Sequence, residues 1–159
     1  MTERVVKELA TFELPSLPGK EREALALVAA AVSASGLLPD QLERLKTAVA
    51  EATMNAIEHG NHDQSDLPVE VTVFEEPGAV VVSISDRGAL TTARGTAVEP
   101  DLDKKLSGLQ TPRGWGLFLI RHMVDAVDEV SDGDRHTVRL TVRLTVHPGV
   151  PPAYPRSQR

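Results

Sequence analysis

The chain has 159 residues, which suits one domain with a real hydrophobic core and is short for two. A formal net charge of −6 argues against the broad basic surface of a nucleic-acid binder, and the absence of cysteine excludes disulfides, thiolate zinc sites and cysteine nucleophiles. The N-terminus lacks the apolar core of a signal peptide, and no apolar run approaches the roughly 20 residues that cross a bilayer. We therefore expect a cytoplasmic protein with no nucleic-acid or membrane partner.

The first half of the chain predicts one strand and two helices. Residues 4–14 mix apolar and polar positions and predict an edge strand. Residues 21–35 are rich in Ala and Leu, which favours a helix that Gly36 ends. A second helix is predicted over residues 40–59, and Gly60-Asn61 stops it. Its apolar residues fall at helical spacing and form one stripe, which consists of Leu42, Leu45, Val49, Ala52 and Ala56.

The second half predicts a hairpin, a long loop, a helix and a last strand. Residues 67–74 and 79–86 alternate apolar with polar positions across an EEPG turn, which is typical of a hairpin. Residues 88–113 show little periodicity, and a loop of this length is usually functional or disordered. Residues 115–125 resume helical spacing. In residues 137–146, Thr and Arg face outward, and the residues expected to face inward are Val138, Leu140, Val142, Leu144 and Val146.

This order of elements predicts a two-layer α/β sandwich, with helices on one face of a mostly antiparallel sheet. We expect the folded domain to cover residues 1–147. Residues 148–159 are rich in proline and are expected to form a disordered tail.

The stretch EATMNAIEHG of the second helix carries a polar band away from its apolar stripe. Glu51 and Asn55 lie one turn apart, and Glu58 and His59 continue the same side. A solvated helix face explains such a band, and so does one wall of a ligand site. For Glu58 we keep the first interpretation, and His59 is interpreted as a helix-end residue that interacts with the helix dipole.

Two further motifs stand where predicted elements end or begin. The D-R-G of residues 86–88 follows an apolar strand, where Asp86 can accept a hydrogen bond and Gly88 lets a flat ring approach the backbone. An ordinary turn is the alternative. The R-G-W-G of residues 113–116 opens a helix, and free N–H groups at a helix start suit phosphates. It is not a P-loop, since no G-K-[ST] follows. The loop between the two motifs is a candidate lid.

Together, E-x-x-x-N on a helix, D-x-G after a strand and G-x-G-L at a helix start resemble the GHKL family of ATP-binding domains (gyrase, Hsp90, histidine kinase, MutL). Within that family, EATMNAIEHGN and RGWGLFLIRHMVDAV are most similar to the small anti-sigma-factor serine kinases of bacteria. The resemblance covers residues 20–146. It implies the Bergerat type of histidine-kinase-like ATPase fold, with ATP and Mg²⁺ as cofactors.

The resemblance also implies roles for individual residues. Asn55 matches the asparagine whose side-chain oxygen coordinates the magnesium ion bridging the ATP phosphates, and a hard oxygen ligand is what that ion prefers. Glu51 matches the general base that takes the proton of an incoming serine hydroxyl. Asp86 matches the carboxylate that accepts a hydrogen bond from the adenine amino group, and Gly88 matches the glycine that lines the adenine pocket.

The remaining matches lie near the predicted loop and the last strand. Gly114 and Gly116 match the phosphate-contacting lid glycines, and Arg113 is either a phosphate contact or a solvated side chain. Thr137 is similar to the threonine that supports the adenine site, with an exposed strand residue as the alternative. Many members carry a second glycine in D-x-G-x-G where this chain has Leu90, a departure that concerns the geometry of the lid.

By this resemblance, we expect a serine-protein kinase that binds a sigma factor, phosphorylates a STAS-type anti-anti-sigma protein and forms a homodimer. The alternative is an ATP-binding regulatory module, or an upstream switch kinase that does not bind a sigma factor directly. The chain lacks the long helical hairpin with a phosphoacceptor histidine that a histidine kinase needs. The roles of gyrase, Hsp90 and MutL require further domains.

Overall fold

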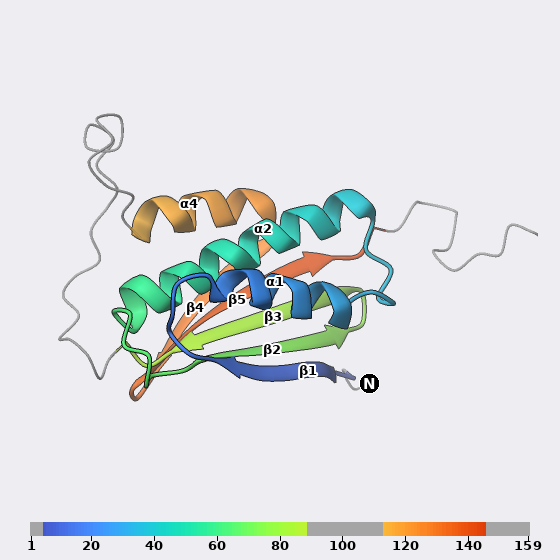
Figure 1. Ribbon diagram of the computed structural model, residues 1–159. Helices are drawn as coiled ribbons and strands as arrows, with labels where there is room; N and C mark the ends of the chain where they lie inside the picture. The colour runs from blue at the N-terminus through green and yellow to red at the C-terminus, as the bar shows by residue number, and fades with distance from the viewer. Residues whose placement is uncertain (1–4, 89–112, 146–159) are drawn as a thin grey trace, which may run out of the picture.

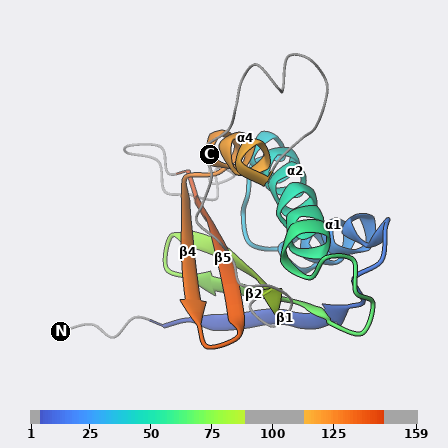
Figure 2. The same ribbon diagram turned by 90° about the vertical axis from the view of Figure 1, so that its left-hand side faces the viewer.

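The computed structural model describes residues 5–88 and 113–145, the side chains of residues 113–116 excepted. In this part of the chain, the helices lie together on one face of an antiparallel sheet (Figures 1 and 2), which confirms the predicted two-layer sandwich. The elements in chain order are β1 (Lys7–Leu14), α1 (Lys20–Ala31), α2 (Pro39–Asn55), the π-helical turn η1 (Ala56–Gly60), β2 (Val69–Glu76), β3 (Ala79–Asp86), α4 (Arg113–Met123), β4 (Ala126–Asp132) and β5 (Arg135–Arg143).

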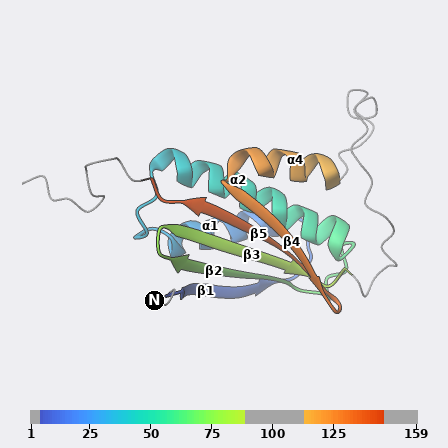
Figure 3. The same cartoon turned by 180° about the vertical axis from the view of Figure 1, so that it is seen from behind.

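The sheet has five strands in the order β1-β2-β3-β5-β4, and every neighbouring pair is antiparallel (Figure 3). The predicted hairpin forms β2 and β3, with Val73 opposite Val82 and with Gly78 in the turn at a φ of 80°. Because this φ favours glycine, the turn residue itself supports the register of the hairpin.

Strand β4 is not among the elements that the sequence predicts. Its sequence AVDEVSD carries three acidic residues and no apolar alternation, and most of its positions are exposed. An edge strand with little cover needs no apolar face, so the usual signal of a strand is absent. Pairing with β5 through a turn at Gly133 supplies the backbone hydrogen bonds that make the segment a strand.

Most predicted boundaries hold within a few residues. Helix α1 ends at Ala31 and not at residue 35, while α4 begins two residues before its predicted start. The predicted tail of residues 148–159, Val146 and Leu90 lie outside the described residues. No helix in the described ranges is long and apolar enough to span a membrane.

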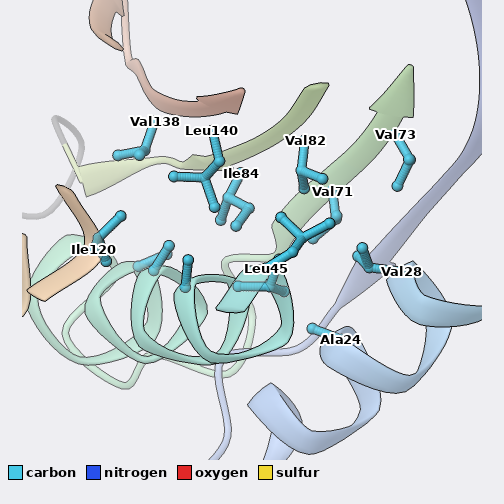
Figure 4. Packing of buried hydrophobic residues seen from close by; sticks show 14 of the residues in the cluster. Ala24, Val28, Leu45, Val71, Val73, Val82, Ile84, Ile120, Val138 and Leu140 are labelled. Atoms are coloured by element: carbon cyan, nitrogen blue, oxygen red, sulfur yellow. The ribbon is translucent and has the colours of Figure 1, made fainter. Parts of the chain in front are cut away.

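Helices and sheet meet in one aliphatic core (Figure 4). The predicted inward positions of β2, β3 and β5 are buried, among them Val71, Val82 and Leu140. Leu45 of α2 is 0% exposed and belongs to the same buried cluster as Val28 of α1 and Val71 of β2. The predicted apolar stripe of the second helix is thus the surface that holds the two layers together. Its members Leu45, Val49, Ala52 and Ala56 are buried, and Leu42 is partly buried.

Replacing Leu45 by alanine should therefore destabilise the fold strongly. Loss of a fully buried leucine costs about 2–5 kcal/mol, because a cavity remains where the side chain was. Urea unfolding followed by circular dichroism measures the change. Leu27→Ala on α1 is the matched control, since Leu27 is 39% exposed and its loss should change the free energy of unfolding by no more than about 0.5 kcal/mol. Equal losses in the two variants would contradict the described core.

Candidate functional site

Three elements come together at one end of the sandwich, on the left in Figure 1. Strand β3 ends there at Asp86, α2 passes into η1, and α4 begins at Arg113. A small cavity lies between them, and its lining consists of Ala52, Asn55, Ala56, Ile84, Asp86, Leu117 and Val138. Apart from Asn55 and Asp86 this lining is aliphatic. Apolar walls with a few converging polar groups are typical of a site for a small, flat ligand.

Asp86 is buried at the end of β3 and is 3% exposed. Its Oδ1 accepts a hydrogen bond of 2.7 Å from the backbone N–H of Gly88, and its Oδ2 lies 3.2 Å from Nδ1 of His136. The structure thus brings together Asp86 and Gly88, both predicted as site residues. This hydrogen bond between the Asp86 side chain and the backbone closes a local turn, and it fixes the direction of the carboxylate.

Gly60, the last residue of η1, packs directly against this carboxylate. A Cβ atom placed on Gly60 would overlap the carboxyl carbon and both oxygens of Asp86. The helix therefore approaches the end of β3 more closely than any residue with a side chain allows. From the sequence, Gly60 is predicted only to end the helix, whereas in the structure its missing side chain makes room for the site.

Asn61 holds the residue after Asp86 in place and was also missed as part of the site. It is fully buried, and its Oδ1 accepts a hydrogen bond of 2.8 Å from the N–H of Arg87. Its Nδ2 group lies within hydrogen-bond distance of three oxygens, those of Ser16 Oγ (2.9 Å), Leu67 O (3.1 Å) and Pro68 O (3.2 Å). An asparagine directly after a helix-ending glycine was the available signal, because asparagine side chains often bond to nearby backbone.

Asn55 is the last residue of α2 and lines the cavity. Within the part of the chain that the structure describes, its Nδ2 is buried without a hydrogen-bond partner, a condition shared only by Thr53 Oγ1. A buried polar group without a partner costs free energy, so a ligand that satisfies it gains affinity. Because an amide can turn its oxygen or its nitrogen toward a ligand, Asn55 can offer the oxygen that a magnesium ion prefers.

The other described residues around the cavity do not form a group of metal ligands. In the described ranges, no group of three histidine or acidic side chains is placed to hold a metal ion. A magnesium ion beside Asn55 would therefore draw most of its ligands from phosphate oxygens and water, which is the usual way in which this ion binds nucleotides. The residues present fit that arrangement.

Glu51 lies one turn before Asn55 on α2. Partial burial raises the pKa of its carboxyl above the ordinary value, and the negative charges of Glu58 and Glu21 raise the pKa further. Since the folded state disfavours the charged form, the stability that Glu51 contributes is present at low pH and is lost as the pH rises through its raised pKa. A carboxyl with a raised pKa is better suited to accept a proton than an ordinary one.

The predicted phosphate-binding segment forms the first turn of α4. Arg113, Gly114 and Gly116 lie there, and their side-chain environment is outside the described residues. The next residue, Leu117, lines the cavity beside Asn55. The start of α4 therefore adjoins the same cavity as the end of α2, as a phosphate-binding helix start requires.

Thr137 is predicted to support the adenine site, and this role stays a prediction. Its hydroxyl is 2.7 Å from Ser85 Oγ on the neighbouring strand. The register pairs Thr137 with Ser85 and His136 with Asp86. Because side chains alternate between the faces of a strand, Thr137 points away from the helices and His136 lies on the side of the site. The predicted alternation of this strand, with threonine outward, already contained this signal.

The architecture and site place the protein in one class, that of histidine kinase-like ATPase domains. A family model described as "Histidine kinase-like ATPase domain" matches residues 14–142, and the chain belongs to this family. The match spans the region from the end of β1 to the end of β5, so it includes every element around the cavity.

Among curated relatives, two proteins named anti-sigma F factor show where in the family the chain lies. The one from Oceanobacillus iheyensis is 30% identical over 119 residues, which cover 74% of this chain and 80% of the relative. The one from Clostridium botulinum (strain Eklund 17B) is 30% identical over 125 residues, covering 74% and 82%. These matches confirm the resemblance to anti-sigma factors.

Two solved structures share the fold. The RsbU and RsbW domains of a Mycobacterium tuberculosis protein match with a TM-score of 0.59 and 21% identity, over 90% of this chain and 33% of that one. The SiaB–SiaC complex of Pseudomonas aeruginosa matches with a TM-score of 0.56 and 16% identity, over 86% and 90%. This chain thus spans about a third of the first structure, and both likenesses concern the fold alone.

Gly60→Ala tests the close approach of η1 to β3. The added methyl group overlaps the Asp86 carboxylate, so we expect a destabilisation of about 1–3 kcal/mol in urea unfolding. The same substitution in an Asp86→Ala background removes the overlap and should cost much less. Additive effects of the two substitutions would contradict the described contact, because residues in contact are expected to be coupled.

Proposed function

We propose that the protein is an ATP-dependent serine-protein kinase of the anti-sigma-factor type. It binds a sigma factor and phosphorylates a STAS-type anti-anti-sigma protein on a serine. The observation that carries the proposal is the meeting of Asn55 and Asp86 at one cavity, with Glu51 one helical turn away. Membership of the ATPase family and the similarity to anti-sigma F factors support it.

In this proposal, each side chain has a task that its position allows. Asp86 accepts a hydrogen bond from the amino group of adenine, and the adenine ring lies between the aliphatic walls of the cavity, next to the backbone of Gly88. The phosphates extend toward Asn55 and the N–H groups at the start of α4, where Gly114 and Gly116 leave the backbone open. The oxygen of Asn55 would hold a magnesium ion, which would neutralise the charge of the phosphates.

Glu51 acts as the general base of the transfer. The serine oxygen of the partner forms a bond to the γ-phosphorus, while the bond between that phosphorus and the ADP oxygen breaks. Glu51 takes the proton from the serine hydroxyl, and ADP leaves with the electron pair of the broken bond. A module that only holds ATP needs no such base, so the position of Glu51 and its raised pKa favour the kinase over a purely regulatory module.

The partners define the remaining part of the proposal. An upstream switch kinase would phosphorylate its STAS partner without binding a sigma factor, so direct measurement of sigma-factor binding separates it from an anti-sigma factor. We also propose a homodimer, because β1 is an edge strand of the described sheet, and the backbone of an edge strand can pair with a second chain. Light scattering of the purified protein gives its mass in solution.

Glu51→Gln separates the kinase from a module that only holds ATP. A loss of the general base should lower phosphotransfer by about 100-fold or more, while the affinity for ATP changes little. The measurement uses magnesium, labelled ATP and a STAS protein, with phosphoserine as the product and nucleotide binding followed by calorimetry. In the unmodified protein, the rate should rise with pH through a pKa above the ordinary value of 4.5, because Glu51 must be ionised to accept a proton.

Glu43→Gln is the matched control for this experiment. Glu43 lies on the same helix and is highly exposed, so its loss should leave both turnover and nucleotide binding unchanged. If Glu51→Gln retains full phosphotransfer, Glu51 is not the base. If the unmodified protein binds ATP but phosphorylates no STAS partner, the kinase proposal is wrong and the regulatory module stands.

A further inference from the structure

His136 occupies a position between two carboxylates that no part of the proposed phosphotransfer uses. Its Nδ1 lies 3.2 Å from Asp86 Oδ2 on β3, and its Nε2 lies 3.0 Å from Glu129 Oε1 on β4. The ring is mostly buried, with 19% of its side chain exposed. On its outer side, Glu129 also lies 3.7 Å from Arg121 of α4.

The geometry decides which atoms carry the hydrogen. A carboxylate oxygen only accepts, so the bond to Asp86 requires a proton on Nδ1 of His136. A neutral ring can satisfy Asp86 or Glu129, whereas an imidazolium donates to both. Both forms of the ring that keep the hydrogen bond to Asp86 carry a proton on Nδ1. A carboxylate bonded to one ring nitrogen commonly determines in this way which nitrogen is protonated.

This hydrogen bond, a second one and a packing contact hold Asp86 in a single orientation. The N–H of Gly88 binds Oδ1, His136 binds Oδ2, and the backbone of Gly60 packs against the carboxylate. Because both oxygens already accept hydrogen bonds from the protein, the group presents only its remaining lone pairs to the cavity. Those lone pairs attract a donor and repel a ligand oxygen.

We propose that His136 is the positioning residue for base selection: it fixes Asp86 as a hydrogen-bond acceptor, so the site prefers a purine with a 6-amino group over one with a 6-oxo group. The inference rests on the proposed nucleotide site. It concerns a residue that acts through Asp86 and does not touch the base itself. Without the histidine, the carboxylate loses the hydrogen bond to Oδ2 and can turn, and the distinction between the two groups weakens.

Binding of ADP and of inosine diphosphate, measured by calorimetry, tests this selection. For His136→Ala, we expect the affinity for ADP to fall about tenfold while the affinity for inosine diphosphate changes little, so the ratio of the two falls about tenfold. His136→Asn should retain most of the preference, because its amide nitrogen stands where Nδ1 stood and can donate to Asp86. Thermal melting of each variant reports whether it folds.

Arg139→Ala is the matched control on the same strand. Arg139 is exposed and lies on the other face of β5, so its loss should change neither affinity. If His136→Ala weakens both nucleotides equally, or leaves the ratio unchanged, His136 has only a structural role and the inference is wrong while the proposed function stands. If the unmodified protein binds neither nucleotide, the proposed function fails and the inference fails with it.

A second measurement tests the hydrogen bond without any nucleotide. Nitrogen-15 correlation spectra of the imidazole rings distinguish a ring protonated at Nδ1 from one protonated only at Nε2. We expect a proton on Nδ1 of His136, and His136→Asn identifies the signal by its loss. A ring protonated only at Nε2 would overturn the inference, because it cannot donate to Asp86.

Discussion

The buried carboxylate of Asp86, pressed against the backbone of Gly60, is the contact on which the arrangement of the site depends. The helix layer and the sheet approach each other so closely there that a single added carbon on Gly60 would overlap the carboxylate. Gly60 is the last residue of the π-helical turn η1, and π-helical turns are frequent at functional sites. Through Asn61, the same turn also holds the backbone that follows Asp86.

Around this contact, the structure contains two polar groups that cost free energy and that an ordinary core avoids. Asn55 keeps a buried amide nitrogen without a partner in the described ranges, and Glu51 is a carboxyl whose charged form is disfavoured by burial and by neighbouring charge. Both groups lie near the end of α2, while the aliphatic core beneath them is well packed. Stability comes from that core, and the unmet polar groups are where a charged, hydrogen-bonding ligand gains most.

Much of the fold follows from periodicity in the sequence. The apolar stripe around Leu45 and the alternation of β2, β3 and β5 predict the helices, the strands and the buried faces, because burial on one side imposes a period of 3.6 or 2. Strand β4 escapes this reasoning, since it gains its strand character from pairing with β5 and buries little apolar surface. Backbone hydrogen bonds at the edge of a sheet do not impose a recognisable pattern on the amino-acid sequence.

Part of the site is predicted from the sequence, and the residues that are not predicted have a physical reason in common. Motifs and spacing point to Asn55 and Asp86, which the structure brings to one cavity. Residues that act by packing or by bonding to backbone carry no motif, so Gly60 and Asn61 were taken only as the end of a helix. No motif marks His136, which pairs with Asp86 in the register of β3 and β5 and lies on the opposite face of the sheet from its neighbour Thr137.

The most direct test of the account is a crystal structure of the protein with magnesium and a non-hydrolysable ATP analogue. The account predicts that the adenine amino group donates to Asp86 between the aliphatic walls of the cavity. It further predicts that the phosphates lie beside Asn55 and the start of α4, with the ion bound to the Asn55 oxygen. A nucleotide bound elsewhere, or an adenine whose amino group does not meet Asp86, would contradict it.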